Sequence, residues 1–488
     1  MLGWEYPPHI AGGLGTACAG LTAELAAQGV SIHFIVPEVF GGERVEHMRF
    51  SSAAGSKSLS PERSVVMLPS EHGVSNGAIE RSSIPAFLSP YWNQSSFAHA
   101  VTAAQRRLNA ERPTTLGVSG CATPAPSGYG EDPIAQAIID GEIFGVSVPS
   151  VEDAPTQQQQ QPQTDTSSPS PREYPSSILS EVEKFTADVV ARFSGAEFDI
   201  IHAHDWMTFP AGVALAKATK RPLIVHVHSL EHDRSGVFYD ESINAIERCG
   251  LESADRVIAV SHYTKSSIER YHSIASKKIA VVHNGIYPKQ VITEYREHKT
   301  WPTHVVLFLG RVTFQKGPEY FVEAARKVIP RVDDIVFVLA GDGDLLPTVK
   351  EHVSRLKLDD YFIFPGFVQG EELEELFSVA DLYVRPSVSE PFGIAALEAI
   401  SFETPVLISK QSGVSEVVTS ALTVDFWDTD SMADLIINVL QQHDLRQELV
   451  ATAKQEIAKL HWSEAAAKTI EIYSQVSDGA GAQEHEGF

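Results

Sequence analysis

The stretch Leu382–Glu398 reads LYVRPSVSEPFGIAALE and contains a strand, a turn and the start of a helix. Its apolar beginning, Leu382–Ser387, predicts a short buried strand. Pro391 suits a first helical position because proline has a fixed φ and no N–H donor. Ligands of open parallel sheets bind beyond the carboxyl ends of the strands. This strand–turn–helix pattern therefore predicts an α/β fold with a site that contains Glu390 and Glu398.

The same alternation of strand and helix continues along most of the chain. The predicted strands are mostly continuous apolar runs, which is typical of parallel strands covered on both faces. Helical patterns such as Thr16–Gln28, Glu183–Arg192 and Pro318–Val328 lie between them. The strands are too many for one ordinary sheet, and an irregular stretch runs from Asn284 to Trp301, so we predict two Rossmann-like domains. The predicted strands are Ser31–Pro37, Phe198–His204, Leu223–Ser229, Arg256–Ser261, Ile279–Gly285, Val305–Arg311, Ile335–Gly341, Tyr361–Phe367, Leu382–Ser387 and Val406–Lys410.

The domain boundaries follow from these patterns. We expect a first domain over 1–288, a second over 289–460, a helix over 461–478 and a disordered tail over 479–488. Residues 151–175, VEDAPTQQQQQPQTDTSSPSPREYP, are rich in Gln, Pro, Ser and Thr. Such a stretch buries too little apolar area to offset its ordering entropy. It predicts a disordered insertion in the first domain at about 115–176, with a linker between independent domains as the alternative.

Composition excludes several classes of protein. The 488 residues carry a formal net charge of −25, which argues against bulk attraction to nucleic acid or to an anionic membrane. No apolar run approaches the roughly 18 residues that cross a bilayer, and MLGWEYPPHI does not resemble a signal peptide. The three cysteines, Cys18, Cys121 and Cys249, are widely spaced, so we expect neither a disulfide framework nor a zinc knuckle. We expect a soluble, cytoplasmic protein with no nucleic-acid partner and no integral membrane contact.

Two further segments could bind an anion. Gly13 and Gly15 lie in GGLG just before a predicted helix, where backbone N–H groups and the helix dipole favour a phosphate. A glycine loop that packs under the helix is the alternative. Arg311 and Lys316 lie in GRVTFQKG, between a predicted strand and a helix that begins at Pro318. This placement suits a diphosphate, with a solvated surface pair as the alternative.

Two predicted strands end in paired histidines, His202 with His204 and His226 with His228, and Asp205 follows the first pair. Residues i and i+2 of a strand share a face, so each pair points one way. The set is compatible with zinc, with hydrogen bonds to sugar hydroxyls, or with a structural role. We select His228 and Asp205 as site candidates because they lie at the strand ends.

The spacing of the two glutamates also limits the chemistry. If Glu390 and Glu398 share one helix they lie ~12 Å apart. That separation is too large for a glycosidase acid/base pair, which needs roughly 5–9.5 Å. It matches the span from a sugar to a ribose across a diphosphate, and Gly393 would let backbone N–H groups approach such a ligand. Two glutamates on a helix surface are the alternative.

Together these motifs resemble those of retaining, two-domain (GT-B) nucleotide-sugar glycosyltransferases. Residues 390–398, EPFGIAALE, are similar to that family's E-x7-E motif, and Arg311 and Lys316 match its donor-diphosphate Arg and Lys. GGLG, HAHDW, VHVHS, Val260–Thr264 and Val282–Gly285 resemble the glycogen/starch synthase branch. The resemblance covers nearly the whole chain except roughly 115–176. It implies two Rossmann-like domains that face a cleft, with the last helix crossing back to the N-terminal domain.

The resemblance also implies a reaction, in which a sugar (glucose is the best guess) moves from a nucleotide diphosphate (ADP-, UDP- or GDP-linked) to a carbohydrate acceptor. Attack on the front face, with the leaving phosphate accepting the proton, would need neither a metal nor a cofactor. The implied catalytic residues are Glu390, His228, Arg311 and Lys316. The implied acceptor or sugar pocket contains His204, Asp205 and His228. The implied donor-binding residues are Gly13, Gly15, Arg311, Lys316, Phe367, Val368, Glu390, Phe392, Gly393, Ile394 and Glu398.

Other functions stay open at the level of sequence. They are a transferase that uses another small-molecule or lipid acceptor, a nucleotide-sugar epimerase of the same fold, a metal-dependent hydrolase that uses the paired histidines, and a catalytically silent carbohydrate-binding protein.

Overall fold

The structure is a computed structural model that describes residues 1–7, 13–37, 48–52, 79–83, 178–289, 295 and 301–484. The side chains of 48–52, 79–83 and 478–484 are not described. The insertion expected at about 115–176 and residues 485–488 of the expected tail lie outside the described residues.

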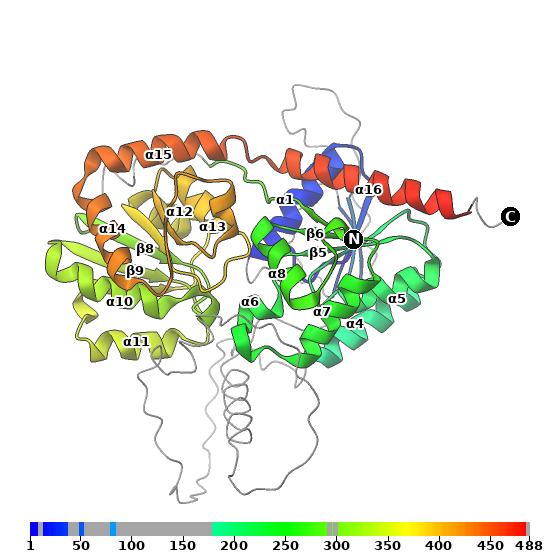
Figure 1. Cartoon of the computed structure of the whole chain (residues 1–488), viewed down its shortest axis with the longest axis horizontal. Helices are drawn as coiled ribbons and strands as arrows, with labels where there is room; N and C mark the ends of the chain where they lie inside the picture. The colour runs from blue at the N-terminus through cyan, green and yellow to red at the C-terminus, as the bar shows by residue number, and fades with distance from the viewer. Residues whose placement is uncertain are drawn as a thin grey trace, which may run out of the picture. The chain divides into compact units, whose positions relative to one another are not determined.

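The first sheet is parallel throughout (Figure 1). One part has the order β1-β3-β2 and the other the order β4-β5-β6-β7. Leu2 forms parallel bridges to Ile35 of β1 and Ala203 of β4, so the N-terminal residues join the two parts. The strands are β1 (Ile32–Val36), β2 (Met48–Ser52), β3 (Ile79–Ser83), β4 (Ile201–His204), β5 (Leu223–Val227), β6 (Arg256–Ala259) and β7 (Ile279–Val281). The helices of this region include α1 (Gly13–Ala27), α4 (Ile178–Phe193), α5 (Phe209–Thr219), α6 (Glu231–Ser235), α7 (Glu241–Ser253) and α8 (His262–His272).

The second sheet has six parallel strands in the order β10-β9-β8-β11-β12-β13 (Figure 1). Its strands are β8 (His304–Leu309), β9 (Ile335–Ala340), β10 (Phe362–Gly366), β11 (Leu382–Arg385), β12 (Val406–Ser409) and β13 (Leu422–Val424). Its α-helices are α10 (Pro318–Val328), α11 (Leu346–Arg355), α12 (Glu371–Val379), α13 (Ile394–Ser401), α14 (Thr429–Gln441) and α15 (His443–Ile457). The prediction of two parallel-sheet α/β domains is confirmed.

Strand β8 shows why the apolar runs are continuous. Val306 and Phe308 are buried in one hydrophobic core, whereas Val305 and Leu307 are buried in another. Successive side chains of a strand point to opposite faces, so helices on both faces of the sheet require apolar residues at every position. Each fully buried side chain of this kind contributes roughly 1.5–3 kcal/mol to stability.

The last helix, α16 (Trp462–Glu484), packs against α1 of the first domain (Figure 1). Trp462 and Ile472 belong to the same hydrophobic core as Leu2. The predicted return of this helix to the N-terminal domain agrees with that core. The expected end at residue 478 is too early, because the helix continues to Glu484 through two glycines, which each cost only about 1 kcal/mol in a helix that has already formed.

Three strands were not predicted. β2 and β3 are polar at several positions (MRFSS and IERSS), and β13 has only three residues, so none shows the continuous apolar run of the others. Among the described residues, no helix combines the length and the apolar character that a membrane span needs.

Candidate active site

The centre of the candidate site is an ion pair between Lys316 and Glu390. Lys316 Nζ donates to Glu390 Oε1 at 2.8 Å, and both side chains are buried. Lys316 ends a short 3₁₀ turn, and the next residue, Gly317, has φ +63°. A Cβ on Gly317 would lie 2.1 Å from the carbonyl oxygen of Pro386. Glycine therefore lets the Lys316 turn pack against the segment that carries Glu390.

The other carboxylate oxygen of Glu390 is also engaged. Arg385 Nε lies 3.4 Å from Glu390 Oε2, and Ser387 Oγ donates to the same oxygen at 3.0 Å. Arg385 ends β11, is buried, and donates to the carbonyl of Leu309. Sequence analysis missed Arg385 and Ser387 as site residues. The available signal was a charged residue that closes the otherwise apolar strand LYVR.

These contacts decide the charge of both groups. Burial opposes ionisation of Glu390, but Lys316 and Arg385 outweigh it and lower the pKa of Glu390 to about 2. Burial also lowers the pKa of Lys316 to about 8, because Glu390 only partly offsets burial and the repulsion of Arg385 and Arg311. At neutral pH the carboxylate is ionised and the ammonium is mostly charged.

Arg311 is half-buried just beyond β8. Its charge acts on two neighbours, since it helps to lower the pKa of Lys316 and opposes the rise that burial causes in the pKa of Asp344. Both predicted cations thus lie in the segment that follows β8, where the charge of Arg311 acts on Lys316. The structure differs from the expectation in one respect: Lys316 is buried and paired with a carboxylate.

Glu398 lies on α13, and Glu390 does not. The helix begins at Ile394 rather than at Pro391, with Gly393 as its N-cap at φ +107°. The ~12 Å separation expected from sequence requires one continuous helix, which Glu390 and Glu398 do not share. A Cβ on Gly393 would lie 3.2 Å from Glu390 Cγ, so this residue fits closely against the carboxylate segment. Glu398 is half-buried, and burial raises its pKa despite the opposing charge of Lys289.

The remaining predicted donor residues of the second domain differ in their surroundings. Phe367 follows β10 and has 62% of its surface exposed, whereas Val368 is buried. Phe392 is buried in a hydrophobic core, and its carbonyl accepts from the N–H of Val414. A ligand cannot contact the Phe392 side chain without disturbing that core. Ile394 is half-buried at the start of α13.

Residues 13–15 of the GGLG segment are helical, which differs from the predicted loop. α1 already begins at Gly13, so Gly13 and Gly15 lie in its first turn. The N–H of Gly15 donates to Glu5 Oε1 at 2.9 Å. This carboxylate occupies the positive end of the helix that was expected to bind a phosphate.

The candidate sugar-pocket residues lie together at the carboxyl ends of β4 and β5. His204 Nδ1 lies 3.0 Å from His228 Nε2, and burial lowers the pKa of His228 to about 3. Asp205 has φ +58°, and its Oδ1 accepts from the backbone N–H groups of His228 and Ser229 at 2.7 and 3.3 Å. Burial raises the pKa of Asp205 to about 7, although these N–H groups and Arg234 favour its charged form. Asp205 therefore fixes the position of His228.

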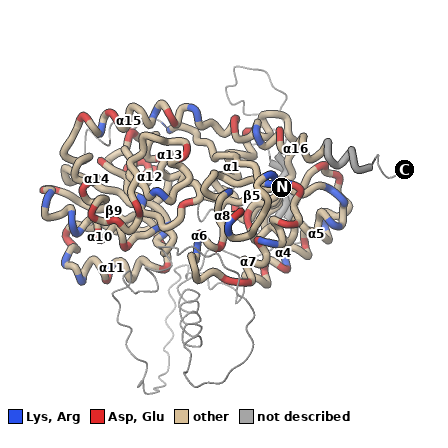
Figure 2. The backbone as a smooth tube through the Cα atoms, in the orientation of Figure 1, with Lys and Arg blue, Asp and Glu red and all other residues tan. Residues whose placement is uncertain are grey.

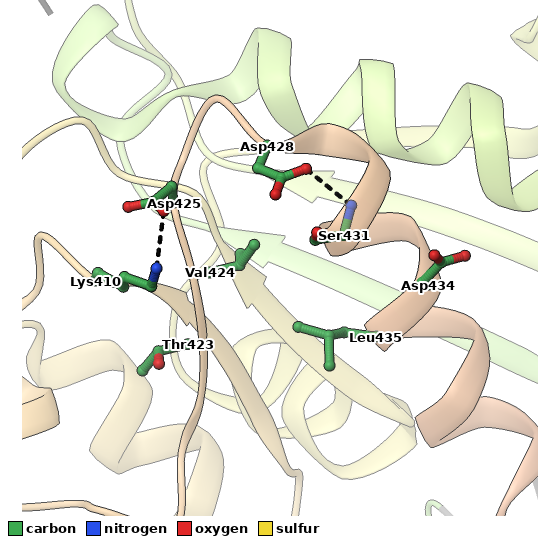
Figure 3. A pocket seen from close by; sticks show the side chains of 8 residues that line it. All are labelled: Lys410, Thr423, Val424, Asp425, Asp428, Ser431, Asp434 and Leu435. Atoms are coloured by element: carbon green, nitrogen blue, oxygen red, sulfur yellow. Dashed lines mark hydrogen bonds and ion pairs between the residues drawn. The ribbon is translucent and has the colours of Figure 1, made fainter. Parts of the chain in front are cut away.

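A hollow of about 360 Å³ lies elsewhere on the second domain, near the ends of β12 and β13 (Figure 3). Lys410 Nζ is paired there with Asp425 Oδ2 at 2.8 Å, and Asp428 caps α14 by accepting from the N–H of Ser431 at 3.0 Å. Its lining includes three aspartates, Asp425, Asp428 and Asp434, against one lysine. That balance repels a diphosphate. Lys and Arg are interspersed with Asp and Glu over the described elements (Figure 2), so local cations decide where an anion binds.

The chain matches three family models, one after another. Residues 1–84 match the starch synthase catalytic domain, residues 148–290 match glycosyltransferase family 4, and residues 291–456 match glycosyl transferases group 1.

Individual proteins agree with these matches. An uncharacterized glycosyltransferase of Methanocaldococcus jannaschii is 32% identical over 299 residues, which are 57% of this chain and 75% of that protein. Alpha-maltose-1-phosphate synthase of Mycolicibacterium smegmatis is 30% identical, with 57% of this chain and 79% of that protein covered. The structure of sucrose-phosphate synthase from Thermosynechococcus elongatus aligns with a TM-score of 0.57 and 23% identity over 64% of this chain and 82% of that one. The structure of HepE of Anabaena in complex with UDP-glucose aligns with a TM-score of 0.53 and 19% identity. The alignment covers 60% of this chain and 82% of that one.

Proposed function

We propose that this chain, which belongs to the GT-B glycosyltransferases of the glycogen and starch synthase-like type, moves a hexose from a nucleotide diphosphate to a carbohydrate acceptor with retention of anomeric configuration. The observation that carries the proposal is the buried arrangement of Lys316, Arg385 and Glu390, with Arg311 close to it.

The cations suit the leaving group. When the sugar–phosphate bond breaks, negative charge accumulates on the departing diphosphate. Arg311 and Lys316 lie at the carboxyl edge of the second sheet, where parallel sheets bind their ligands. Fixed cations at that position interact more strongly as the charge develops, so they lower the barrier beyond binding the substrate.

Glu390 suits an electrostatic role better than a covalent one. Its carboxylate is engaged by Lys316, Arg385 and Ser387, and its pKa is about 2. A carboxylate so stabilised is a weak nucleophile, because attack would require it to give up these partners. We therefore propose attack by the acceptor on the face that the diphosphate leaves, with the acceptor's proton passing to a phosphate oxygen. Glu390 then orients the sugar and favours its developing positive charge.

The donor and the acceptor are proposed from chemistry and from the relatives. Glu398, on α13, would accept hydrogen bonds from the ribose, and the exposed ring of Phe367 would contact the base. His228 and His204 would face the transferred sugar or the acceptor. Alpha-maltose-1-phosphate synthase, a glycogen synthase of Mycobacterium tuberculosis and HepE with UDP-glucose are among the proteins this chain resembles. Glucose linked to ADP or UDP is therefore the proposed donor.

A ligand screen tests the proposal. The full chain is heated with ADP-, UDP- and GDP-linked sugars, each in excess, and the release of nucleoside diphosphate is assayed in parallel. A ligand at 100 times its dissociation constant adds about 2.7 kcal/mol to the free energy of unfolding, so the donor should raise the melting temperature clearly. Lys316→Met should abolish both signals, whereas the exposed Lys410→Met, at the acidic hollow, should retain them. If no nucleotide sugar stabilises the chain or is consumed, the proposed function is wrong.

A further inference from the structure

Four imidazoles form a compact group inside the first domain. His202 and His204 come from β4, and His226 and His228 come from β5 or its end. The rings of each pair stack with centroids 4.3 Å apart, and the rings of His204 and His228 lie 5.3 Å apart. Alternate residues of two adjacent parallel strands thus present all four rings on one face.

Several ring nitrogens of this group have no protein partner, which is unusual for buried polar atoms. Among the described residues, Nε2 of His202, Nε2 of His204 and both nitrogens of His226 are buried without a hydrogen bond. Each unpartnered buried polar atom typically costs about 1–3 kcal/mol. Of the three rings with such an atom, His204 is the one whose other nitrogen, Nδ1, lies 3.0 Å from His228 Nε2.

A cysteine completes a ligand set next to these rings. Cys18 is buried on α1, and it, His204 and His228 each offer a ligand atom, all within 4.8 Å of one another. His204 Nδ1 and His228 Nε2 are 3.0 Å apart. Tetrahedral zinc with bonds of 2.0–2.1 Å places two nitrogen ligands roughly 3.3 Å apart, so only a small movement is needed.

We propose that Cys18, His204 and His228 bind one divalent ion of the zinc class, and that the bound ion inhibits the transferase by holding His228. Sulfur and imidazole are the ligands that such an ion prefers, and a three-residue set leaves the fourth position for water.

This set is favoured over the all-histidine set of His202, His204 and His226 for two reasons. His228 is half-buried, so an ion can reach it, whereas the other three rings are almost fully buried. His202 Nδ1 already lies 2.6 Å from the hydroxyl of Tyr473.

Binding of the ion releases one proton, that of the Cys18 thiol. The ion displaces the thiol proton of Cys18 into solvent and forms an S–metal bond. It also takes the lone pairs of His204 Nδ1 and His228 Nε2, so each neutral ring carries its single proton on the other nitrogen. The inhibitory part of the proposal rests on the proposed function, because it assigns His228 to the sugar pocket.

Cobalt provides a spectroscopic test. The full chain is stripped with a chelator, dialysed, and titrated with Co²⁺, followed by Zn²⁺ in competition. We expect one Co²⁺ per chain, a thiolate-to-cobalt charge-transfer band, and loss of that band on addition of Zn²⁺. Cys18→Ala should lose the band and at least roughly tenfold in affinity, and so should His228→Gln, whose half-buried site tolerates the change. Cys249→Ala, which changes an exposed cysteine, is the matched control and should bind as the wild type does.

Activity is measured on the same samples. One equivalent of Zn²⁺ should lower donor turnover in the wild type and in Cys249→Ala but not in Cys18→Ala. The proposal is overturned if no stoichiometric Co²⁺ binds, or if the band survives in Cys18→Ala. It is also overturned if cobalt binds without a thiolate band, which would assign the ion to the three buried histidines. A cobalt spectrum on a chain that transfers no sugar would refute the proposed function and leave the metal site standing.

Discussion

Lys316 Nζ lies 2.8 Å from Glu390 Oε1, although the two residues are 74 positions apart in the chain. The pair joins the turn after β8 to the segment after β11, so two neighbouring strands of the second sheet deliver opposite charges to one buried point. Arg385 approaches the same carboxylate from its other oxygen. Such a carboxylate can stabilise the fold through its ion pairs, and it can also act electrostatically on a bound substrate. Variants of these residues can separate the two roles.

The first prediction concerns stability. Lys316 is buried and paired with Glu390, so its side chain contributes to folding as well as to the charge of the site. Removal of one partner of a buried ion pair typically costs about 3–5 kcal/mol. Urea denaturation should show a loss of that order for Lys316→Ala and a smaller loss for Arg311→Ala, whose side chain is only half-buried. The double variant Lys316→Met/Glu390→Gln should lose less than the sum of its single changes; strict additivity would mean that the two groups do not interact.

The second prediction concerns Arg385, which the sequence analysis had not selected. Arg385→Lys should reduce turnover by roughly 10²–10³, since an ammonium cannot reproduce the fork that contacts Glu390, Ser387 and the Leu309 carbonyl at once. Arg331→Lys is the matched control because its pair with Asp434 is exposed. Steady-state kinetics on both variants measures the loss of turnover, and melting temperatures show whether each variant is folded. Near-normal turnover in Arg385→Lys would restrict this residue to a structural role.

The third prediction separates the two glutamates. Glu390→Gln retains the shape of the side chain but removes the charge that we propose acts on the sugar, so kcat should fall strongly while donor binding is mostly retained. Glu398→Gln should mainly weaken donor binding, since Glu398 lies on α13 and is proposed to accept hydrogen bonds from the ribose. Calorimetric titration with the donor and turnover measurements distinguish the two cases. Equal and mild effects at both positions would contradict the assignment of roles.

The fourth prediction is a pH dependence. Because the pKa of Lys316 is about 8, its ammonium is present at neutral pH and is lost as the pH rises through that value. The ratio kcat/KM reports ionisations of the free enzyme, so it should decline above pH of about 8. Lys316→Arg should be less active throughout, yet without this alkaline decline, because a guanidinium does not titrate in that range. A profile that stays flat in the wild type to pH 10 would show that the charge of Lys316 is not needed.

Sequence could predict the parts of the site that depend on local pattern. Apolar runs identified β8 and β11, and Pro318 marked the start of α10 at the residue where the structure has it. The contacts of Arg385 could not be predicted because they depend on which strands are neighbours: β8 lies next to β11 only in the folded sheet. Pro391 was an incorrect helix start, since Gly393 at positive φ delays α13 to Ile394 and separates Glu390 from the helix of Glu398. The glycine pattern likewise does not predict the hydrogen bond from the N–H of Gly15 to Glu5 Oε1, because that bond depends on how the N-terminal residues fold against α1.

The anomeric configuration of the released sugar tests the central claim most directly. Many transferases slowly pass the donor sugar to water, so the measurement does not require the natural acceptor. The full chain is incubated with UDP- or ADP-α-glucose, and early proton NMR spectra are recorded before the product equilibrates. We predict that α-glucose forms first, at a rate that Lys316→Met and Glu390→Gln reduce strongly and Lys410→Met does not. Initial formation of β-glucose would contradict retention and the roles assigned to Lys316 and Glu390.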